Sequence, residues 1–300
     1  MTTPIIQVEN LSKTYRQQAV LSEVSFQLEE AGIYGLAGRN GAGKTTLLSS
    51  LLGQTIPTSG RVLLYGQEPK GKVLARTHLQ RTQQTYPEGL SVQGALKLAE
   101  RTYPTWDAKL AETLLSDLQL APKAKAQKLS QGQKSALGIT LALASRADIT
   151  LLDEPYTGLD PVARGVFYQH LLEDYAAHPR LILFSTHLLD EAAPLLSHLL
   201  VLDRGRLVLE AEADQVGSRF HRVTGSATAV SVYLTATQLE SSLLQDQASG
   251  NLRGVTLQAP LKPAYQELAQ QIGVQLHSLS LQEVLAAYTT VSEAQGGAHD

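Results

Sequence analysis

The chain has 300 residues, of which 43% are hydrophobic, and this is enough to bury the core of one large domain or two smaller ones. A formal net charge of −3, with no local block of Lys or Arg, gives no basic field for nucleic acid, so no nucleic-acid partner is expected. The chain has no cysteine, which excludes disulfides, cysteine nucleophiles and cysteine-based zinc sites and is compatible with a reducing compartment.

No segment of the sequence has the form of a leader or of a membrane span. The first residues, MTTPIIQVEN, lack a basic region followed by an apolar core. The longest apolar runs, such as residues 199–202, are far shorter than the roughly 18 residues that a spanning helix needs. We therefore expect that any role at a membrane depends on a partner.

Alternating apolar residues predict two antiparallel strands at the start of the chain. The first runs through Ile5, Ile6, Val8 and Leu11 to Tyr15, and the second contains Val20, Val24, Phe26 and Leu28. A turn at Pro57, Ser59 and Gly60 precedes a third strand at residues 61–65. Together these three strands predict an antiparallel flank.

A glycine-rich stretch after the second strand fits the phosphate-loop pattern G-x-x-x-x-G-K-[ST] at residues 38–45. The preceding residues 33–37 are mostly apolar, as a buried strand needs. Glycines let the backbone turn with few clashes, so that successive N–H groups and a helix N-terminus point at one place where phosphate oxygens can sit. Lys44 then reaches the β- and γ-phosphates, and Thr45 offers a hydroxyl to Mg²⁺. The alternative is an ordinary Gly-rich loop.

Helical periodicity replaces the strand pattern over residues 87–127 and indicates a helical insertion. The stretch LSQGQ at residues 129–133 then begins an Ala/Leu-rich helix, and an apolar strand follows that ends at Asp153 and Glu154. Beside a phosphate loop, Asp153 suits a hydrated metal, while Glu154 is placed to orient or deprotonate an attacking water. An Asp-Glu pair is also common at an ordinary solvated strand end, and that alternative stays open.

A further buried strand at residues 181–184 runs into Ser185, Thr186 and His187. A lone histidine is more often structural. This one stands at the end of a strand that would lie beside the phosphate loop, where imidazole can contact a γ-phosphate. Residues 199–209 then indicate a β-hairpin, after which the phosphate-binding core is expected to end near Glu210.

The residues after Glu210 predict a small α/β accessory domain over 211–300. Its predicted elements are a strand with Val230, Val232 and Leu234, a helix with Leu239, Leu243 and Leu244, and further alternation at Val255, Leu257, residues 265–272, Val274 and Leu276. Ser280 and Glu283 form a capping-box pattern that predicts a final short helix. Residues 292–300 are expected to be a frayed tail.

Taken together and in order, these motifs resemble the nucleotide-binding subunit of an ATP-binding cassette (ABC) transporter over about residues 4–210. The most telling stretches are LSQGQ ahead of ITLLDEP, then YTGLDP, and STH ending at His187. Small GTPases would require an N-K-x-D base-reading motif, which this sequence lacks, and no kinase combines these motifs. The stretches YPEGLSV, YPTWDAKLAETLL and GLDPVAR are most similar to bacterial subunits that serve exporters of antibiotics, bacteriocins, ions or related cargo.

The resemblance implies an α/β P-loop NTPase fold of the ABC ATPase type, with a mixed sheet, an antiparallel flank and a helical subdomain at about 87–135, within a domain at 1–210. It also implies a Mg²⁺-dependent ATPase that pairs with a second ABC ATPase, either identical or different, and energises a transmembrane permease at the cytoplasmic face of the cell membrane. One alternative is a soluble ABC ATPase that acts without a permease, in regulation, translation or repair. Another is a non-enzymatic regulator that merely binds ATP, against which the intact Glu154 argues.

Carried onto this sequence, the resemblance assigns Glu154 as the base, His187 as the switch histidine and Gln84 as the glutamine that contacts Mg²⁺ and senses the membrane partner. Gln83 and Gln80 are the alternatives to Gln84. Thr45, Gln84 and Asp153 would hold Mg²⁺. The ATP-binding set comprises an adenine-stacking aromatic, the Walker A loop, the signature motif and the loop that crosses to the second subunit: Tyr15, Gly38, Arg39, Asn40, Gly41, Ala42, Gly43, Lys44, Thr45, Thr46, Ser130, Gln131, Gly132, Gln133 and Asp160. In this family the signature motif contacts ATP held by the other protomer.

Two residues depart from the family's pattern. Gln131 occupies a signature position where glycine is commonest, but Ser130, Gly132 and Gln133 keep the γ-phosphate donors. Thr150 interrupts the apolar Walker B strand, where a β-branched residue still fits the sheet and its hydroxyl can find a backbone partner. Neither departure argues against ATPase activity.

Overall fold

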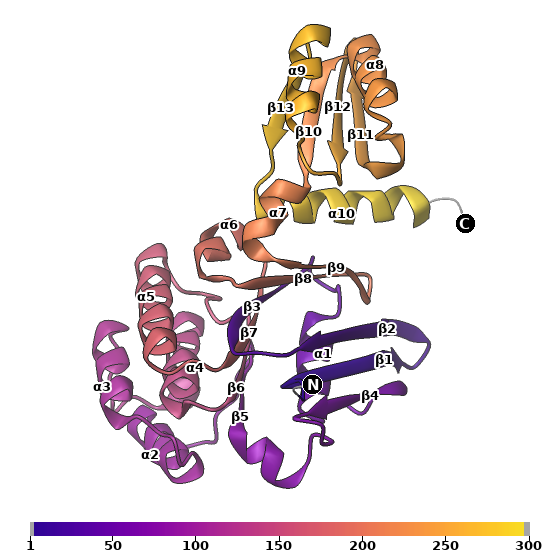
Figure 1. The fold of residues 1–300 in the computed structure, drawn as a ribbon. Helices are drawn as coiled ribbons and strands as arrows, with labels where there is room; N and C mark the ends of the chain where they lie inside the picture. Colours follow the sequence, from indigo (N-terminus) through magenta and orange to yellow (C-terminus); the bar gives the residue numbers. More distant parts are fainter. Residues whose placement is uncertain (1–2, 297–300) are drawn as a thin grey trace.

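The computed structural model describes residues 3–296, and a six-stranded sheet lies at the centre of the first part of the chain (Figure 1). The strand order is β5 (Thr77–Gln80), β6 (Ile149–Asp153), β7 (Leu181–Thr186), β3 (Gly32–Ala37), β8 (His198–Asp203) and β9 (Arg206–Glu212). All neighbours are parallel except β9, which forms the predicted hairpin with β8. Every residue of β3, β6 and β7 is buried, which explains their near-continuous apolar runs. Thr150 in β6 donates to the Ala147 carbonyl at 3.0 Å, which confirms the expected backbone partner.

A three-stranded antiparallel sheet confirms the predicted flank. Its order is β2 (Gln18–Leu28), β1 (Ile6–Tyr15) and β4 (Ser59–Leu64). One hydrophobic cluster joins this flank, helix α1 (Lys44–Leu51) and the central sheet, and it includes Ile6, Leu28, Leu36, Leu47, Leu151 and Leu200. The phosphate loop between β3 and α1 is therefore held by packing on both of its sides.

Helices gather on the side of the central sheet away from the antiparallel flank, as Figure 1 shows. They are α2 (Val92–Thr102), α3 (Ala108–Asp117), α4 (Gln131–Ser145) and α5 (Pro161–Ala177), with the short 3₁₀ segment η2 (Ala126–Lys128) between α3 and α4. Another 3₁₀ segment, η1 (Gly71–Arg76), connects β4 to β5 and contributes Val73 to the cluster of the flank. A second cluster joins these helices to the sheet, with Leu114, Leu137, Phe167, Ile182 and Phe184 among its members. The predicted helical insertion is confirmed by α2, α3 and the start of α4.

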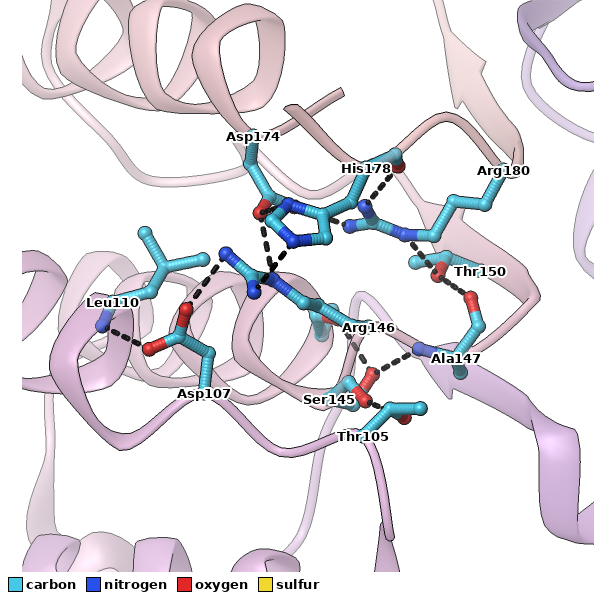
Figure 2. A network of polar contacts seen from close by, with 11 residues as sticks. Thr105, Asp107, Leu110, Ser145, Arg146, Ala147, Thr150, Asp174, His178 and Arg180 are labelled. Carbon is cyan, nitrogen blue, oxygen red and sulfur yellow. Dashed lines mark hydrogen bonds and ion pairs between the residues drawn. The ribbon is translucent and has the colours of Figure 1, made fainter. Parts of the chain in front are cut away.

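A cluster of charged side chains ties the helical insertion to the core (Figure 2). Arg146 ends α4 in the left-handed conformation and pairs with Asp107 at 2.6 Å and with Asp174 of α5 at 3.1 Å. Arg180 Nη2 lies 2.7 Å from Asp174 Oδ2, as an ion pair without the alignment of a hydrogen bond. Because Asp174 and Arg180 are buried, each charge depends on the others for compensation.

The chain then builds a second unit, seen at the top of Figure 1. It is reached through α6 (Leu189–Ala192), η3 (Ala193–Leu195), the β8–β9 hairpin and α7 (Ala213–Arg219). Its antiparallel sheet has the order β11 (Leu243–Ser249), β12 (Leu252–Leu257), β10 (His221–Ser226) and β13 (Gln275–Ser278), and it packs against α8 (Ala227–Thr237) and α9 (Pro263–Ile272), with η4 (Glu240–Ser242) before β11. A separate hydrophobic cluster that includes Val223, Tyr233 and Val255 fills the space between sheet and helices.

Two elements of this unit differ from the sequence prediction. Helix α8 contains the predicted strand residues Val230, Val232 and Leu234, strand β11 contains the predicted helix residues Leu243 and Leu244, and Leu239 lies between the two elements. The prediction was wrong because Val232 is 49% exposed, whereas Val230, Tyr233 and Leu234 are buried at the spacing of a helix. Ser226 fixes the start of α8, since its side chain accepts the Ala229 N–H.

The last helix, α10 (Leu281–Gly296), returns to the first part of the chain. The predicted capping box at its start is confirmed, with Glu283 N–H donating to Ser280 Oγ at 3.3 Å and Ser280 N–H donating to Glu283 Oε2 at 3.0 Å. Its apolar residues Leu281, Val284 and Leu285 join the core of the first part. The expected tail at residues 292–300 begins inside this helix, and 297–300 lie outside the described residues. Between residues 3 and 296, no helix combines the length and apolar character needed to cross a membrane.

Candidate active site

The phosphate loop passes from β3 to α1 through backbone that only glycine accommodates. Gly43 has φ 106°, and a Cβ there would lie 2.8 Å from the Val20 carbonyl oxygen. A Cβ on Gly38 would lie 2.4 Å from the Leu202 carbonyl oxygen. No side chain caps the start of α1, and the residues of its first turn line a cavity. A helix N-terminus that opens into a cavity in this way is suited to phosphate.

This cavity has a volume of about 650 Å³. It is lined by the phosphate loop, the segment after β5 and the acidic pair: Val20, Asn40, Gly41, Gly43, Lys44, Thr45, Thr46, Arg81, Thr82, Gln83, Asp153 and Glu154. A larger hollow of about 960 Å³ lies on the sheet of the C-terminal unit, and it contains none of the predicted site residues. We therefore place the chemistry in the smaller cavity, where the predicted residues converge.

Asp153 is held at the end of β6 by two hydroxyl groups. Thr45 Oγ1 donates to its Oδ2 at 2.9 Å, and Ser185 Oγ donates to its Oδ1 at 2.8 Å. Ser185 also accepts the Glu154 N–H at 2.9 Å, so one hydroxyl orients both acidic residues. The sequence showed Ser185 only as the end of a strand, because its contact with Asp153 depends on the pairing of β6 with β7.

The oxygen donors of Thr45 and Asp153 fit Mg²⁺, which takes few protein ligands and completes its shell with phosphate and water. Within residues 3–296, no three or more His, Asp or Glu side chains cluster as a metal site. A hydroxyl and one carboxylate instead suit a metal that arrives bound to a nucleotide.

Lys44 places a buried ammonium group between the loop and the acidic pair. Its Nζ donates to the Gly38 carbonyl at 2.7 Å and to the Arg39 carbonyl at 3.2 Å, and it lies 3.4 Å from Glu154 Oε1. Glu154 has φ 44°, a left-handed conformation that is uncommon outside glycine, and it lines the cavity with Lys44. The cation and the carboxylate thus share one side of the site.

His187 completes this group, and a tyrosine that the sequence analysis did not select holds its backbone. His187 Nδ1 lies 3.6 Å from Glu154 Oε2, and the His187 N–H donates to the Tyr156 hydroxyl at 2.9 Å. That hydroxyl donates to Thr186 Oγ1 at 2.8 Å, and burial raises the pKa of Tyr156 above its ordinary value. Tyr156 therefore bridges the strand that carries Glu154 and the strand that carries His187. The only sequence signal for it was its place in the YTGLDP motif.

The segment after β5 brings Gln83, and not Gln84, to the cavity lining. Gln80 ends β5 and is buried, with its Nε2 donating to the Arg81 carbonyl at 3.1 Å and its Oε1 without a hydrogen-bond partner. Thr82 Oγ1 donates to the Asp153 carbonyl at 2.7 Å, which fixes this segment against β6. Of the three candidate glutamines, the structure thus places the alternative Gln83 beside Lys44 and Asp153.

Besides Gln84, these predicted residues are not part of the cavity lining: Tyr15, Gly38, Arg39, Ala42, Ser130, Gln131, Gly132, Gln133, Asp160 and His187. Gln131 is adjacent to it, because its Nε2 donates to the carbonyl of the lining residue Thr82 at 2.8 Å. Tyr15 ends β1 and is 47% exposed. Ser130 and Gln133 cap α4 reciprocally, and Asp160 caps α5 by accepting the Ala163 N–H at 2.9 Å. Gly132 packs against the loop before α5, since a Cβ there would lie 2.3 Å from the Gly158 carbonyl oxygen.

A nucleotide whose phosphates follow the loop to Lys44 would bring its terminal phosphate to Thr45, Asp153 and Glu154. A phosphate loop with its lysine and hydroxyl, beside an acidic pair at a strand end, defines a P-loop nucleoside triphosphatase. The chain is a protein of that class.

Comparison with known proteins narrows the class further. The model of the ABC transporter family matches residues 21–157. The Nod factor export ATP-binding protein I of Cupriavidus metallidurans is 35% identical over 222 residues, which cover 71% of this chain and 73% of the relative. The ABC transporter ATP-binding protein YtrB of Bacillus subtilis is 28% identical, covering 73% of this chain and 76% of the relative. A solved ATP-binding subunit of an ABC transporter is 26% identical, with a TM-score of 0.63, covering 71% of this chain and 91% of that subunit.

The chain belongs to the ABC transporter family. It is an ATP-binding subunit of that family and an ATPase that works for transport. The family resemblance, the P-loop NTPase fold and the enzymatic activity expected from the sequence are thereby confirmed.

Proposed function

We propose that this chain hydrolyses Mg·ATP as one of two nucleotide-binding subunits that drive an export permease in the cell membrane. The observation that carries this function is the convergence of Lys44, Thr45, Asp153 and Glu154 on one cavity. The export direction is supported by the similarity to the Nod factor export ATP-binding protein I.

Each of these side chains has a separate task in the hydrolysis. Lys44 binds the β- and γ-phosphates, and Thr45 with Asp153 would hold Mg²⁺, whose charge neutralises the phosphate oxygens. Glu154 accepts a proton from the attacking water. The oxygen of that water bonds to the γ-phosphorus as the bond between the γ-phosphorus and the ADP oxygen breaks. His187, held by Tyr156, contacts the γ-phosphate and keeps it next to Glu154.

A second copy would complete the site. Ser130 and Gly132 lie outside the lining of their own chain's cavity. Ser130 is the N-cap of α4, and Gly132 is the second residue of that helix. We propose that this helix start faces the nucleotide of the other protomer, with Asp160 on the loop that crosses between the two. The N-terminal end of α4 provides backbone N–H groups and a positive dipole for the γ-phosphate there.

The permease would dock on the side of the helical insertion near residues 84–90. In this segment Glu88 is exposed. The Gly89 carbonyl accepts from Lys125 Nζ at 3.0 Å, and this contact ties the segment to the helical insertion, so that the two would move together. The subunit would lie at the cytoplasmic face of the membrane, and the cargo would be selected by the permease.

The test is purification of the tagged chain from detergent-solubilised membranes of its native cell. We expect a polytopic membrane protein to co-purify, and Glu88→Lys to weaken that association. Glu112→Lys, a matched charge reversal at an exposed position of α3, should leave the association intact. Recovery of the chain with ribosomes or DNA in the soluble fraction would favour an ABC ATPase that has no permease.

A further inference from the structure

The short helix α6 begins two residues after His187, and the chain around it supplies no side-chain cap. The cap comes from the last helix of the protein. Leu189 N–H, in the first turn of α6, donates to Gln282 Oε1 at 3.2 Å, although 93 positions separate these residues. An N–H group at a helix start needs such an acceptor when no local one is present.

The contact is reciprocal. Asp190 in the first turn of α6 accepts the Gln282 N–H at 3.1 Å through Oδ1 and the Ser280 hydroxyl at 3.1 Å through Oδ2. Each helix therefore supplies an acceptor for the first turn of the other. A carboxylate at the start of α10 is also favoured by the positive end of that helix.

The other side of α6 is fixed to the core. Arg164 of α5 pairs with both oxygens of Glu191, Nε at 3.0 Å and Nη2 at 3.2 Å. This two-pronged geometry holds a carboxylate in one orientation. The segment after His187 thus has one anchor in α5, the helix capped by Asp160, and a second anchor in α10.

We propose that Gln282 and Asp190 are positioning residues for hydrolysis, which act by fixing the segment that carries His187. This inference rests on the proposed role of His187, and it gives the C-terminal unit, expected at 211–300, a function in catalysis. Any displacement of α10 by a partner of that unit would loosen α6 and lower the rate of hydrolysis. The C-terminal unit would then set turnover without touching the nucleotide.

The first test is Gln282→Ala, which removes the acceptor of the Leu189 N–H and leaves the Gln282 backbone contact to Asp190 in place. We expect kcat for ATP to fall about three- to tenfold, the effect of losing one helix cap, while the KM for ATP is unchanged. Hydrogen exchange of a peptide covering residues 187–192 should accelerate. Gln266→Ala, the same substitution at an exposed position near the start of α9, should change neither kcat nor the hydrogen exchange of residues 187–192.

The second test separates positioning from general stability. Asp190→Ala should lower kcat by a similar factor, whereas Asp190→Asn keeps an acceptor oxygen for the Gln282 N–H and should retain most of the rate. Faster hydrogen exchange at residues 187–192 with an unchanged kcat would overturn the proposal. Hydrogen exchange at these residues that is the same in Gln282→Ala as in the wild type would also overturn it. The rates of the wild type and of Gln266→Ala test ATP hydrolysis itself, so a failure of the proposed function would be seen there.

Discussion

Thr45 and Asp153 are joined by a hydrogen bond of 2.9 Å although 108 positions separate them in the sequence. Thr45 stands in the first turn of α1, and Asp153 is the last residue of β6. The bond therefore connects the phosphate loop to the strand that carries the acidic pair. Because both oxygens belong to the proposed Mg²⁺ site, one connected unit would recognise the metal and the nucleotide.

Replacement of Lys44 should weaken nucleotide binding. Lys44→Ala removes a charge-assisted contact to the β- and γ-phosphates, worth about 1.5 to 3 kcal/mol, so ATP affinity should fall about ten- to hundredfold. Titration with ATP and Mg²⁺ measures the change. An unchanged affinity would contradict the placement of the phosphates at the loop.

Replacement of Glu154 should separate ATP binding from hydrolysis. Glu154→Gln keeps the size and hydrogen bonding of the side chain but removes the base, which contributes about 10²- to 10⁴-fold to the rate. The variant should bind ATP, hydrolyse it slowly and accumulate as a dimer in light scattering. Glu112→Gln on the exposed face of α3 serves as the control. Normal turnover in a strictly monomeric Glu154→Gln protein would exclude a site shared between two copies.

The hydroxyl of Tyr156 should matter for turnover but not for ATP affinity. Tyr156→Phe removes two hydrogen bonds, the one that the His187 N–H donates to the hydroxyl and the one that the hydroxyl donates to Thr186, so kcat should fall by at least about fivefold, the effect of one net hydrogen bond. Tyr168→Phe is a matched control, because the Tyr168 hydroxyl is buried without a hydrogen-bond partner. Equal kcat values for the two variants would show that Tyr156 does not position His187.

The buried charge cluster of Figure 2 should be sensitive to the loss of Asp174. Asp174→Ala leaves Arg146 and Arg180 without their shared carboxylate, which should cost about 3 to 5 kcal/mol of unfolding free energy. Urea unfolding followed by circular dichroism measures this loss. Asp246→Ala breaks an exposed pair with Arg253 and should cost no more than about 1 kcal/mol. A similar loss in both variants would mean that the buried cluster is no more important than a surface pair.

Those parts of the fold and site that depend on short local patterns were predictable. The glycines and Lys44 specify the phosphate loop within a few residues, and apolar runs such as residues 33–37 and 181–184 identify strands that are buried on both faces. The family resemblance added the order and roles of the motifs. The ends of two apolar strands had already identified Glu154 and His187, which the structure brings within 3.6 Å of each other.

The remaining features depend on contacts that no local pattern records. Ser185 and Tyr156 act through neighbours on adjacent strands, so their roles follow only from the pairing of β6 with β7. The choice among three nearby glutamines depended on the path of the segment after β5. In α8, the three alternating residues Val230, Val232 and Leu234 fitted a strand as well as a helix, and only the burial of Tyr233 with Val230 and Leu234 distinguishes the two.

The length of α4 has a mechanical consequence. Its 15 residues make a rod of about 22 Å, with Ser130 at one end and Arg146 held by two carboxylates at the other. For a helix of this length, a tilt of about 5° around the Arg146 end would move Ser130 by about 2 Å. With the Arg146 end held by its ion pairs, a small rotation of the helix would appear as an ångström-scale displacement of Ser130.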